Sequence, residues 1–102
     1  MGDISSDPET LLLISLADGA KHGHAMLLDI EAFTGRRLGP GTLYGALSRL
    51  EEEGLIEPLP TEGRRRPYRL TRRGRLALRE RVGRLAVAVR VGRRRLTQGS
   101  VQ

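Results

Sequence analysis

Apolar residues recur three and four positions apart along the first half of the chain, which is the period of helices with one buried face. Three such stretches predict three helices. The first starts after Ser6 or Asp7, either of which can cap it, and stops at Gly19; it is apolar on more than one side, so we expect it to be central. The second spans residues 23–33, and the third opens at residues 39–41 and reaches residue 53. Their inward stripes are Met26, Leu27, Ile30 and Phe33, then Leu43, Ala46, Leu47 and Leu50.

The helical period stops after the third stretch, and the next pattern is that of a β-hairpin. Residues 55–59 predict a short strand, and residues 61–63 have the composition of a turn. Residues 67–70 predict the return strand, whose Pro67 suits the edge of a sheet. The three arginines at residues 64–66 therefore lie at or near the tip of the hairpin.

A long helix completes the predicted fold. Thr71 can cap it, and it runs over residues 72–96, followed by a polar tail at 97–102 that we expect to be disordered. Three helices, a basic hairpin and a further helix, in that order, are typical of a winged helix-turn-helix. The predicted fold class is mainly α with a small β-hairpin: a winged-helix DNA-binding domain over residues 1–71 and a C-terminal dimerisation helix over residues 72–96.

Size and composition narrow the class of protein. A chain of 102 residues has room for one domain, with a core that is marginal for a monomer. The longest apolar run, residues 11–14, is far shorter than the roughly 20 residues of a membrane span, and no secretion signal is recognisable. The absence of cysteine excludes disulfides and thiolate metal sites. We therefore expect a cytoplasmic protein with no membrane partner.

The charges are distributed unevenly. Residues 1–63 contain 4 Lys or Arg and 11 Asp or Glu, whereas residues 64–102 contain 14 Arg and one acid, Glu80. This asymmetry indicates a polyanionic partner for the second part. However, 17 of the 18 basic residues are Arg, which a biased genome composition also produces, so charge alone does not decide for nucleic acid.

The outer side of the third helix is suited to reading DNA. On a helical wheel, small and hydrogen-bonding residues lie opposite the leucine stripe. They are Gly41, Gly45, Ser48 and Glu52, flanked by Thr42, Tyr44 and Arg49. Such a surface can enter the major groove closely, and Arg49 can donate two hydrogen bonds to guanine or to a phosphate. The alternative is a solvated helix face, with Tyr44 half-buried as packing.

The hairpin adds a second, independent indication. Arg64, Arg65 and Arg66 repel one another unless an anion neutralises them, and a hairpin tip can lie along the DNA backbone or in a minor groove. A solvated charged loop is the alternative for this segment. Helix and hairpin together favour DNA binding more strongly than either does alone.

Three segments closely resemble the PadR-like transcriptional regulators: HGH at residues 22–24, LGPGTLYGALSRLEEEGLI at residues 38–56, and PYRLTRRG at residues 67–74. The resemblance covers roughly residues 10–80. It implies a winged helix-turn-helix and usually a dimeric repressor, with DNA contacts from the third helix and the wing. The residues that match the family's DNA-contacting pattern are Pro40, Gly41, Thr42, Tyr44 and Arg49 in the helix, and Arg66 and Tyr68 in the wing.

The chain departs from the family pattern at two positions. His24 stands where members often have Tyr, which puts a backbone contact from the second helix in doubt. Gly39 stands where they often have Ser, so a side-chain cap is lost, at a cost of about 0.5 kcal/mol or less.

The last helix carries a predicted dimer seam. Its apolar residues follow heptad spacing, with Gly92 at the missing position. They are Leu78, Val82, Leu85, Val89 and Leu96. A helix of about 25 residues is roughly 37 Å long and overhangs so small a domain, so pairing with a second copy would bury the overhang. The alternative is that the stripe packs on its own domain, at least in its early part.

No catalytic or metal site is predicted, and no cofactor. His22 and His24 precede or begin a helix and are expected to be surface or capping residues, since no cysteine or clustered carboxylate completes a metal set. The predicted partners are double-stranded DNA, a second copy of the chain, and a small-molecule or anionic effector. The sequence predicts no enzyme but a repressor that binds an inverted-repeat operator as a homodimer. The alternative is a winged-helix module that binds a protein or an anionic ligand without sequence-specific DNA binding.

Overall fold

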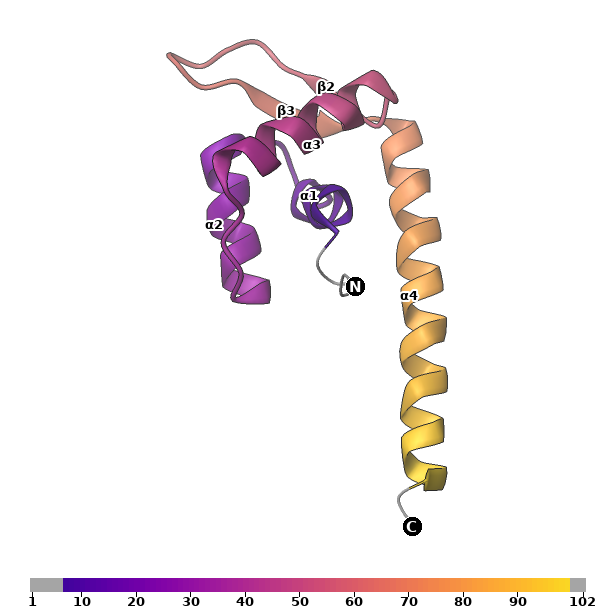
Figure 1. The fold of residues 1–102 in the computed structure, drawn as a ribbon. Helices are drawn as coiled ribbons and strands as arrows, with labels where there is room; N and C mark the ends of the chain where they lie inside the picture. The colour runs from indigo at the N-terminus through magenta and orange to yellow at the C-terminus, as the bar shows by residue number, and fades with distance from the viewer. Residues whose placement is uncertain (1–6, 100–102) are drawn as a thin grey trace.

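The computed structural model describes residues 7–99, and residues 1–6 and 100–102 lie outside the described part (Figure 1). The elements are α1 (Pro8–Leu16), β1 (Lys21–His22), α2 (Gly23–Thr34), α3 (Pro40–Glu52), β2 (Ile56–Pro58), β3 (Pro67–Leu70) and α4 (Arg72–Gly99). This order confirms the predicted fold class, mainly α with a small sheet and a long last helix. The molecule is elongated, 59 × 26 × 23 Å, because α4 extends beyond the other elements.

Local chemistry sets where the helices begin and end. Asp7, one of the two predicted caps, accepts hydrogen bonds from the backbone N–H of Glu9 (3.1 Å) and from the hydroxyl of Thr10 (2.7 Å). Gly39 precedes α3 without a side-chain cap, as its substitution for Ser predicts. Helix α2 ends at Gly35, whose φ of 74° is a left-handed conformation that favours glycine.

The hydrophobic core surrounds α1, which is apolar all round and contacts α2, α3, α4 and β3. The inward stripe predicted for α3 is buried throughout. The buried apolar residues are Leu11, Leu12, Leu13, Leu16, Met26, Ile30, Leu38, Leu43, Ala46, Leu47, Leu50, Leu55, Ile56 and Leu78. Phe33, predicted to face inward, is exposed near the end of α2, so that part of the stripe prediction is wrong. The core therefore fixes α3 from behind and leaves its opposite side open.

The sheet has three antiparallel strands in the order β1-β3-β2, one more than the predicted hairpin. In β1, Lys21 pairs with Tyr68 and His22 with Pro67. Strand β3 is consequently central, and the edge position predicted for Pro67 is wrong. Proline is tolerated there because it is the first residue of its strand, where a missing N–H costs least. Pairing of β1 with β3 attaches the start of α2 to the base of the wing.

Helix α4 has 28 residues and is about 42 Å long. Only its start is buried, at Gly74 and Leu78, and its second half projects away from the domain (Figure 1). It runs through Thr97 to Gly99, so it is longer than predicted, and only residues 100–102 of the expected disordered tail lie outside the described part. Within residues 7–99, no helix is both long enough and apolar enough to span a membrane.

Candidate nucleic-acid interface

The outer side of α3 is open to solvent at its N-terminal end. Gly41, Thr42, Tyr44 and Ser48 are all exposed, because the leucine stripe on the other side is packed into the core. Tyr44 is 59% exposed, an exposure that a DNA-reading surface and the alternative of a solvated helix face both predict. Arg49 is exposed as well, so all five helix residues singled out in the sequence are accessible, with Tyr44 on one flank and Thr42 and Arg49 on the other.

A hollow of about 230 Å³ lies where α3, the start of α2 and the wing meet. It brings together residues from three separate parts of the chain and contains no carboxylate. It is lined by His22, Gly23, His24, Tyr44, Arg64, Arg65, Arg66 and Tyr68. All four wing residues predicted from the sequence thus lie beside Tyr44 of α3, and the surface that they form is strongly basic.

The wing arginines (Arg64, Arg65 and Arg66) lie at the tip of the hairpin, where Gly63 and Arg64 form a tight turn. Glu62 pairs with Arg65 across this turn, and Gly63 between them has a φ of 62°. The guanidinium of Arg66 donates to the carbonyl of Leu59 on the opposite strand (3.1 Å), which ties this side chain across the hairpin. None of the three wing arginines forms an ion pair with any acid of residues 7–99. Their positive charges are therefore available to a partner.

Tyr68 lies in the central strand at the base of the wing. Partial burial raises the pKa of its hydroxyl, and the negative charge of Glu51 acts in the same direction, whereas Arg66 opposes them. The hydroxyl is consequently protonated at neutral pH and can donate a hydrogen bond into the hollow.

Arg49 does not line the hollow. Its guanidinium Nε donates to a carboxylate oxygen of Glu9 in the first turn of α1, at 3.1 Å. It lies on the flank of α3 that faces away from the wing, together with Thr42. The structure therefore gives Arg49 an intramolecular partner, which the sequence did not predict.

His22 combines an expected and an unexpected contact. Its Nδ1 accepts a hydrogen bond from the backbone N–H of Ala25 at 3.3 Å and so caps α2, which confirms the capping role expected for this residue. Its Nε2 lies 3.2 Å from the guanidinium of Arg65 in the wing. No pattern in the sequence could indicate this second contact, because the two residues are 43 positions apart. Within residues 7–99, no cluster of three potential metal ligands exists.

A family model described as "Transcriptional regulator PadR-like family" matches residues 12–80. The chain belongs to this family. The resemblance in the sequence is thereby confirmed, and the chain has the winged-helix fold of the PadR-like family.

Two relatives with curated sequences match about two thirds of the chain. The chain is 51% identical over 70 residues to an uncharacterised 37.1 kDa protein in transposon TN4556 of Streptomyces fradiae, covering 69% of this chain and 20% of that protein. It is 38% identical over 65 residues to the transcriptional activator GvpE of Haloferax mediterranei, covering 64% and 33%. The chain thus spans a fifth to a third of the length of these relatives.

Solved structures share the fold. A transcriptional regulator from Clostridium thermocellum has a TM-score of 0.76 and 27% identity, covering 85% of this chain and 87% of that one. Bacillus subtilis PadR, solved in complex with operator DNA, has a TM-score of 0.62 and 22% identity, covering 71% and 44%. At that identity, the second likeness concerns the fold alone.

In this PadR-like chain, the seam residues of α4 divide into two groups. Leu78 is buried in the chain's own core, and Leu85 is partly covered by α1. Val82, Val89 and Leu96 are exposed on the same helix face. The early part of the stripe therefore packs within the domain, as the alternative allowed, while the later part is open.

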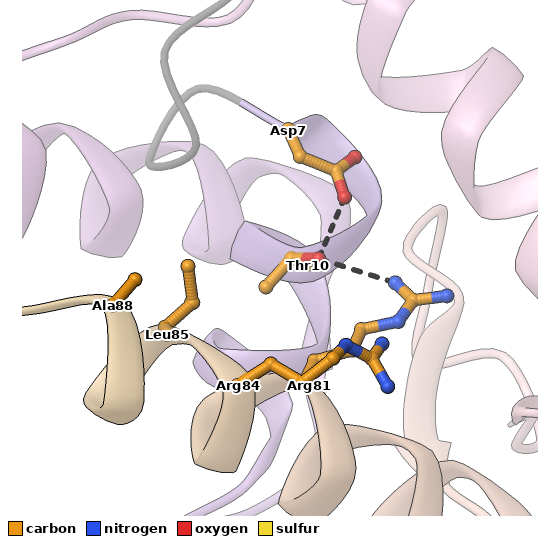
Figure 2. A pocket seen from close by; sticks show the side chains of 6 residues that line it. All are labelled: Asp7, Thr10, Arg81, Arg84, Leu85 and Ala88. Carbon is orange, nitrogen blue, oxygen red and sulfur yellow. Dashed lines mark hydrogen bonds between the residues drawn. The ribbon is translucent and has the colours of Figure 1, made fainter.

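A groove of about 470 Å³ runs between the start of α1 and the middle of α4 (Figure 2). Arg81 of α4 donates to the hydroxyl of Thr10 (3.2 Å), which in turn donates to the carboxylate of Asp7 (2.7 Å). The α4 side is completed by Arg84, Leu85 and Ala88. The groove thus joins a basic helix face to the capped start of α1.

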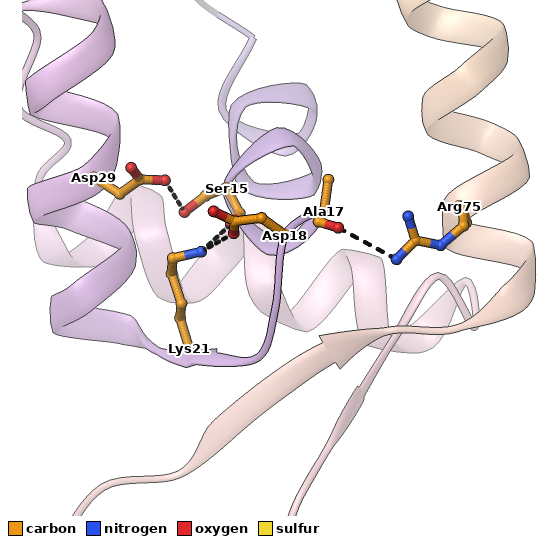
Figure 3. Close-up of polar contacts among 6 residues, drawn as sticks. All are labelled: Ser15, Ala17, Asp18, Lys21, Asp29 and Arg75. Carbon is orange, nitrogen blue, oxygen red and sulfur yellow. Dashed lines mark hydrogen bonds and ion pairs between the residues drawn. The ribbon is translucent and has the colours of Figure 1, made fainter.

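The opposite end of α1 is held by polar contacts (Figure 3). The buried hydroxyl of Ser15 donates to Asp29 of α2 at 2.7 Å. Lys21 donates to Asp18 and to the carbonyl of Ser15, and its hydrogen bond and charge lower the pKa of the Asp18 carboxyl. Arg75 of α4 donates to a carbonyl at the end of α1. These contacts join α1 to its neighbours and account for the polar groups there without any ligand.

Proposed function

We propose that this PadR-like regulator is a cytoplasmic repressor, not an enzyme, that binds an inverted-repeat operator in double-stranded DNA as a homodimer. The observation that carries the proposal is one hollow in which the three wing arginines lie beside Tyr44 of the exposed side of α3. Repression would follow from occupation of a promoter by the bound dimer. That Bacillus subtilis PadR was solved with operator DNA supports the choice of partner.

The proposed DNA contacts divide by chemistry. Gly41, Thr42, Tyr44 and Ser48 lie on the part of α3 that can enter the major groove, where small side chains permit close approach and hydroxyls can bond base edges. The wing arginines and Tyr68 would contact the backbone and supply affinity that does not depend on sequence. Arg49 would bind a phosphate beside the groove in competition with Glu9.

The proposed homodimer rests on the exposed stripe of α4. Val82, Val89 and Leu96 lie on one face of a helix that projects from the domain, and burying them requires a second copy or another partner. A two-fold axis through this helix would relate the two α3 helices, so the operator should contain two inverted half-sites about one helical turn apart.

One pair of substitutions in α4 tests the seam. Val89 and Val87 are almost equally exposed, at 51% and 48%, but two helical positions place them about 200° apart around the axis. We expect Val89→Asp to yield monomers in sedimentation velocity and to lose most of its operator affinity. Val87→Asp introduces the same charge into the same helix and should remain dimeric. Dimers of both variants would contradict the proposed seam.

Selection of bound duplexes from random DNA tests the function itself. The proposal predicts a consensus with inverted symmetry. Recovered duplexes without any consensus would indicate non-specific DNA binding and contradict the proposed operator recognition. Failure to recover any duplex would instead favour the interaction module, whose acidic partner or nucleotide would bind the arginines.

Our proposal includes an anionic effector in the groove between α1 and α4, where Asp7 is the one carboxylate among the described lining residues (Figure 2). Arg81 and Arg84 lie on one wall, and Leu85 provides an apolar surface beside them. An anion bound there would alter the contact between α4 and α1, and thereby the spacing of the two reading helices.

A further inference from the structure

The ring of His22 connects the start of α2 to the tip of the wing. Its Nδ1 faces the backbone N–H of Ala25 at 3.3 Å, and its Nε2 faces the guanidinium of Arg65 at 3.2 Å. Both neighbours are hydrogen-bond donors and neither can accept. The ring is therefore placed between two donors.

Hydrogen-bond accounting leaves this arrangement one acceptor short. A neutral imidazole has one nitrogen that accepts and one that carries a hydrogen, so it can serve Ala25 or Arg65 but not both. When Nδ1 caps α2, the hydrogen is on Nε2 and points toward the Arg65 guanidinium. Two N–H groups then converge on the hollow with no acceptor between them. An oxygen placed there would accept from both.

The surroundings favour an anionic oxygen. The other lining residues contribute two further wing arginines, the hydroxyls of Tyr44 and Tyr68 and the ring of His24, but no carboxylate. Gly23 allows α3 to approach closely: a Cβ at this position would lie 3.2 Å from Leu43 and 3.4 Å from the hydroxyl of Tyr44. The volume of about 230 Å³ is several times the roughly 30 Å³ share of one water, so a tetrahedral phosphate fits.

We propose that the hollow binds one backbone phosphate of the DNA duplex through Arg65 and the Nε2–H of His22. The phosphate supplies the missing acceptor, while Nδ1 remains bonded to Ala25. Because Arg65 of the wing and His22 at the end of β1 hold the same phosphate, the phosphate fixes the wing relative to α2 and α3. This assignment rests on the proposed DNA binding, but it adds His22 and its Nε2 atom to the DNA contacts proposed above.

Two substitutions of His22 separate its two nitrogens. In His22→Asn, the side-chain oxygen can replace Nδ1 as the cap of α2, since Asn is among the best N-caps, but nothing replaces Nε2. In His22→Gln, the amide NH₂ can reach the position of Nε2, but the cap is weakened. We expect His22→Asn to melt like the wild type and to bind duplex DNA about ten- to a hundredfold more weakly, the size of one lost hydrogen bond to a charged group. His22→Gln should melt at a lower temperature and retain more of the affinity.

Neutral methylphosphonates locate the contact on the DNA. In a series of duplexes, each duplex has one phosphate replaced by a methylphosphonate. The affinities of the wild type and of His22→Asn are measured on every duplex. We expect one position per half-site at which the replacement weakens the wild type about tenfold or more but hardly affects His22→Asn, because that contact is already lost. The other positions should weaken both proteins equally and serve as internal controls.

The outcomes distinguish this assignment from the proposed function. If His22→Asn binds as tightly as the wild type, or if no position shows coupling, the assignment is wrong even where a symmetric consensus is found. If the selection gives no consensus but His22→Asn still weakens binding to duplex DNA, the phosphate contact stands and the proposed operator recognition fails. Failure of the wild type to bind any duplex overturns both.

Discussion

Gly74 lies in the first turn of α4, directly against the segment that leads into β2. A Cβ at this position would be 1.9 Å from the carbonyl oxygen of Leu55 and 2.9 Å from its carbonyl carbon. Real Cβ atoms do not approach other atoms closer than 3.0 Å, so in Gly74→Ala the backbones must separate by about 1.1 Å or more. The same junction contains hydrogen bonds from Thr71 to the carbonyls of Leu55 (3.0 Å) and Gly54 (2.6 Å). Separating the two backbones stretches both of these hydrogen bonds.

The expected destabilisation follows from these contacts. Overpacking costs roughly 1–3 kcal/mol, and two weakened hydrogen bonds add about 1 kcal/mol each. The higher helix propensity of alanine offsets about 0.8–1 kcal/mol of this destabilisation. We therefore expect Gly74→Ala to lower the free energy of unfolding by about 3 kcal/mol, which for a domain of this size lowers the melting temperature by at least about 12 °C.

Urea unfolding followed by circular dichroism measures this difference, at one fixed protein concentration because association would shift the midpoint. Gly83→Ala is the matched control: it lies in the same helix with nothing within 4 Å of the added carbon, so it should raise stability by about 0.5–1 kcal/mol. If Gly74→Ala is as stable as Gly83→Ala, the close contact at Leu55 does not exist and α4 leaves the domain by another path.

Three further predictions concern the cap, the tyrosine and the wing. Asp7→Ala should lower the free energy of unfolding by about 1 kcal/mol, and Asp7→Asn, which preserves an acceptor, should recover most of it. Partial burial raises the pKa of Tyr68 above the ordinary 10.0, so folding favours the protonated hydroxyl. The resulting contribution to the free energy of unfolding is complete below pH 10 and is lost as the pH rises through the folded-state pKa. Absorbance titration of Tyr44→Phe, in which Tyr68 is the last tyrosine, should give a midpoint above 10.0 that returns to about 10 in denaturant, and equal midpoints would disprove the burial effect. Replacing the wing arginines with alanine should weaken binding to all sequences and flatten the log–log salt slope by up to about three units, and an unchanged slope would remove the wing from the phosphate contacts.

The helices could be predicted because their signals are local. The bounds of α3 differ from the prediction by about one residue, since the leucine stripe, the opening Pro40 and the closing Gly54 all lie within the segment itself. Strand β3 begins at Pro67 and ends at Leu70, as predicted from the turn before it. In each case, the residues that determine the element are its own or adjacent ones.

The features that the sequence did not reveal depend on partners far along the chain. Strand β1 has two residues and no alternation of its own, and it exists because β3 offers a pairing edge more than 40 residues later. Spacing placed Arg49 on the outer side of α3 but could not show Glu9, 40 residues earlier, as its partner. Heptad spacing likewise assigned Leu78 to the seam, although the approach of α4 to α1 places it in the core.

Helix α1 joins the surface proposed for DNA to the helix proposed for dimerisation. Two adjacent residues in its first turn make the connection: Glu9 binds Arg49 of α3, and Thr10 binds Arg81 of α4. These polar contacts are too weak to transmit much, because an ion pair that is partly open to solvent contributes about 0–1 kcal/mol and a single hydrogen bond about 0.5–1.5 kcal/mol. The buried side chains of the same helix are the stronger connection, since a close-packed core does not let one helix slide without moving the next. Val82, the first exposed residue of the seam, follows Arg81 directly. A second copy seated on α4 would therefore act on α3 mainly through the leucines of α1, and substitutions there should alter DNA binding even though none of them faces the duplex.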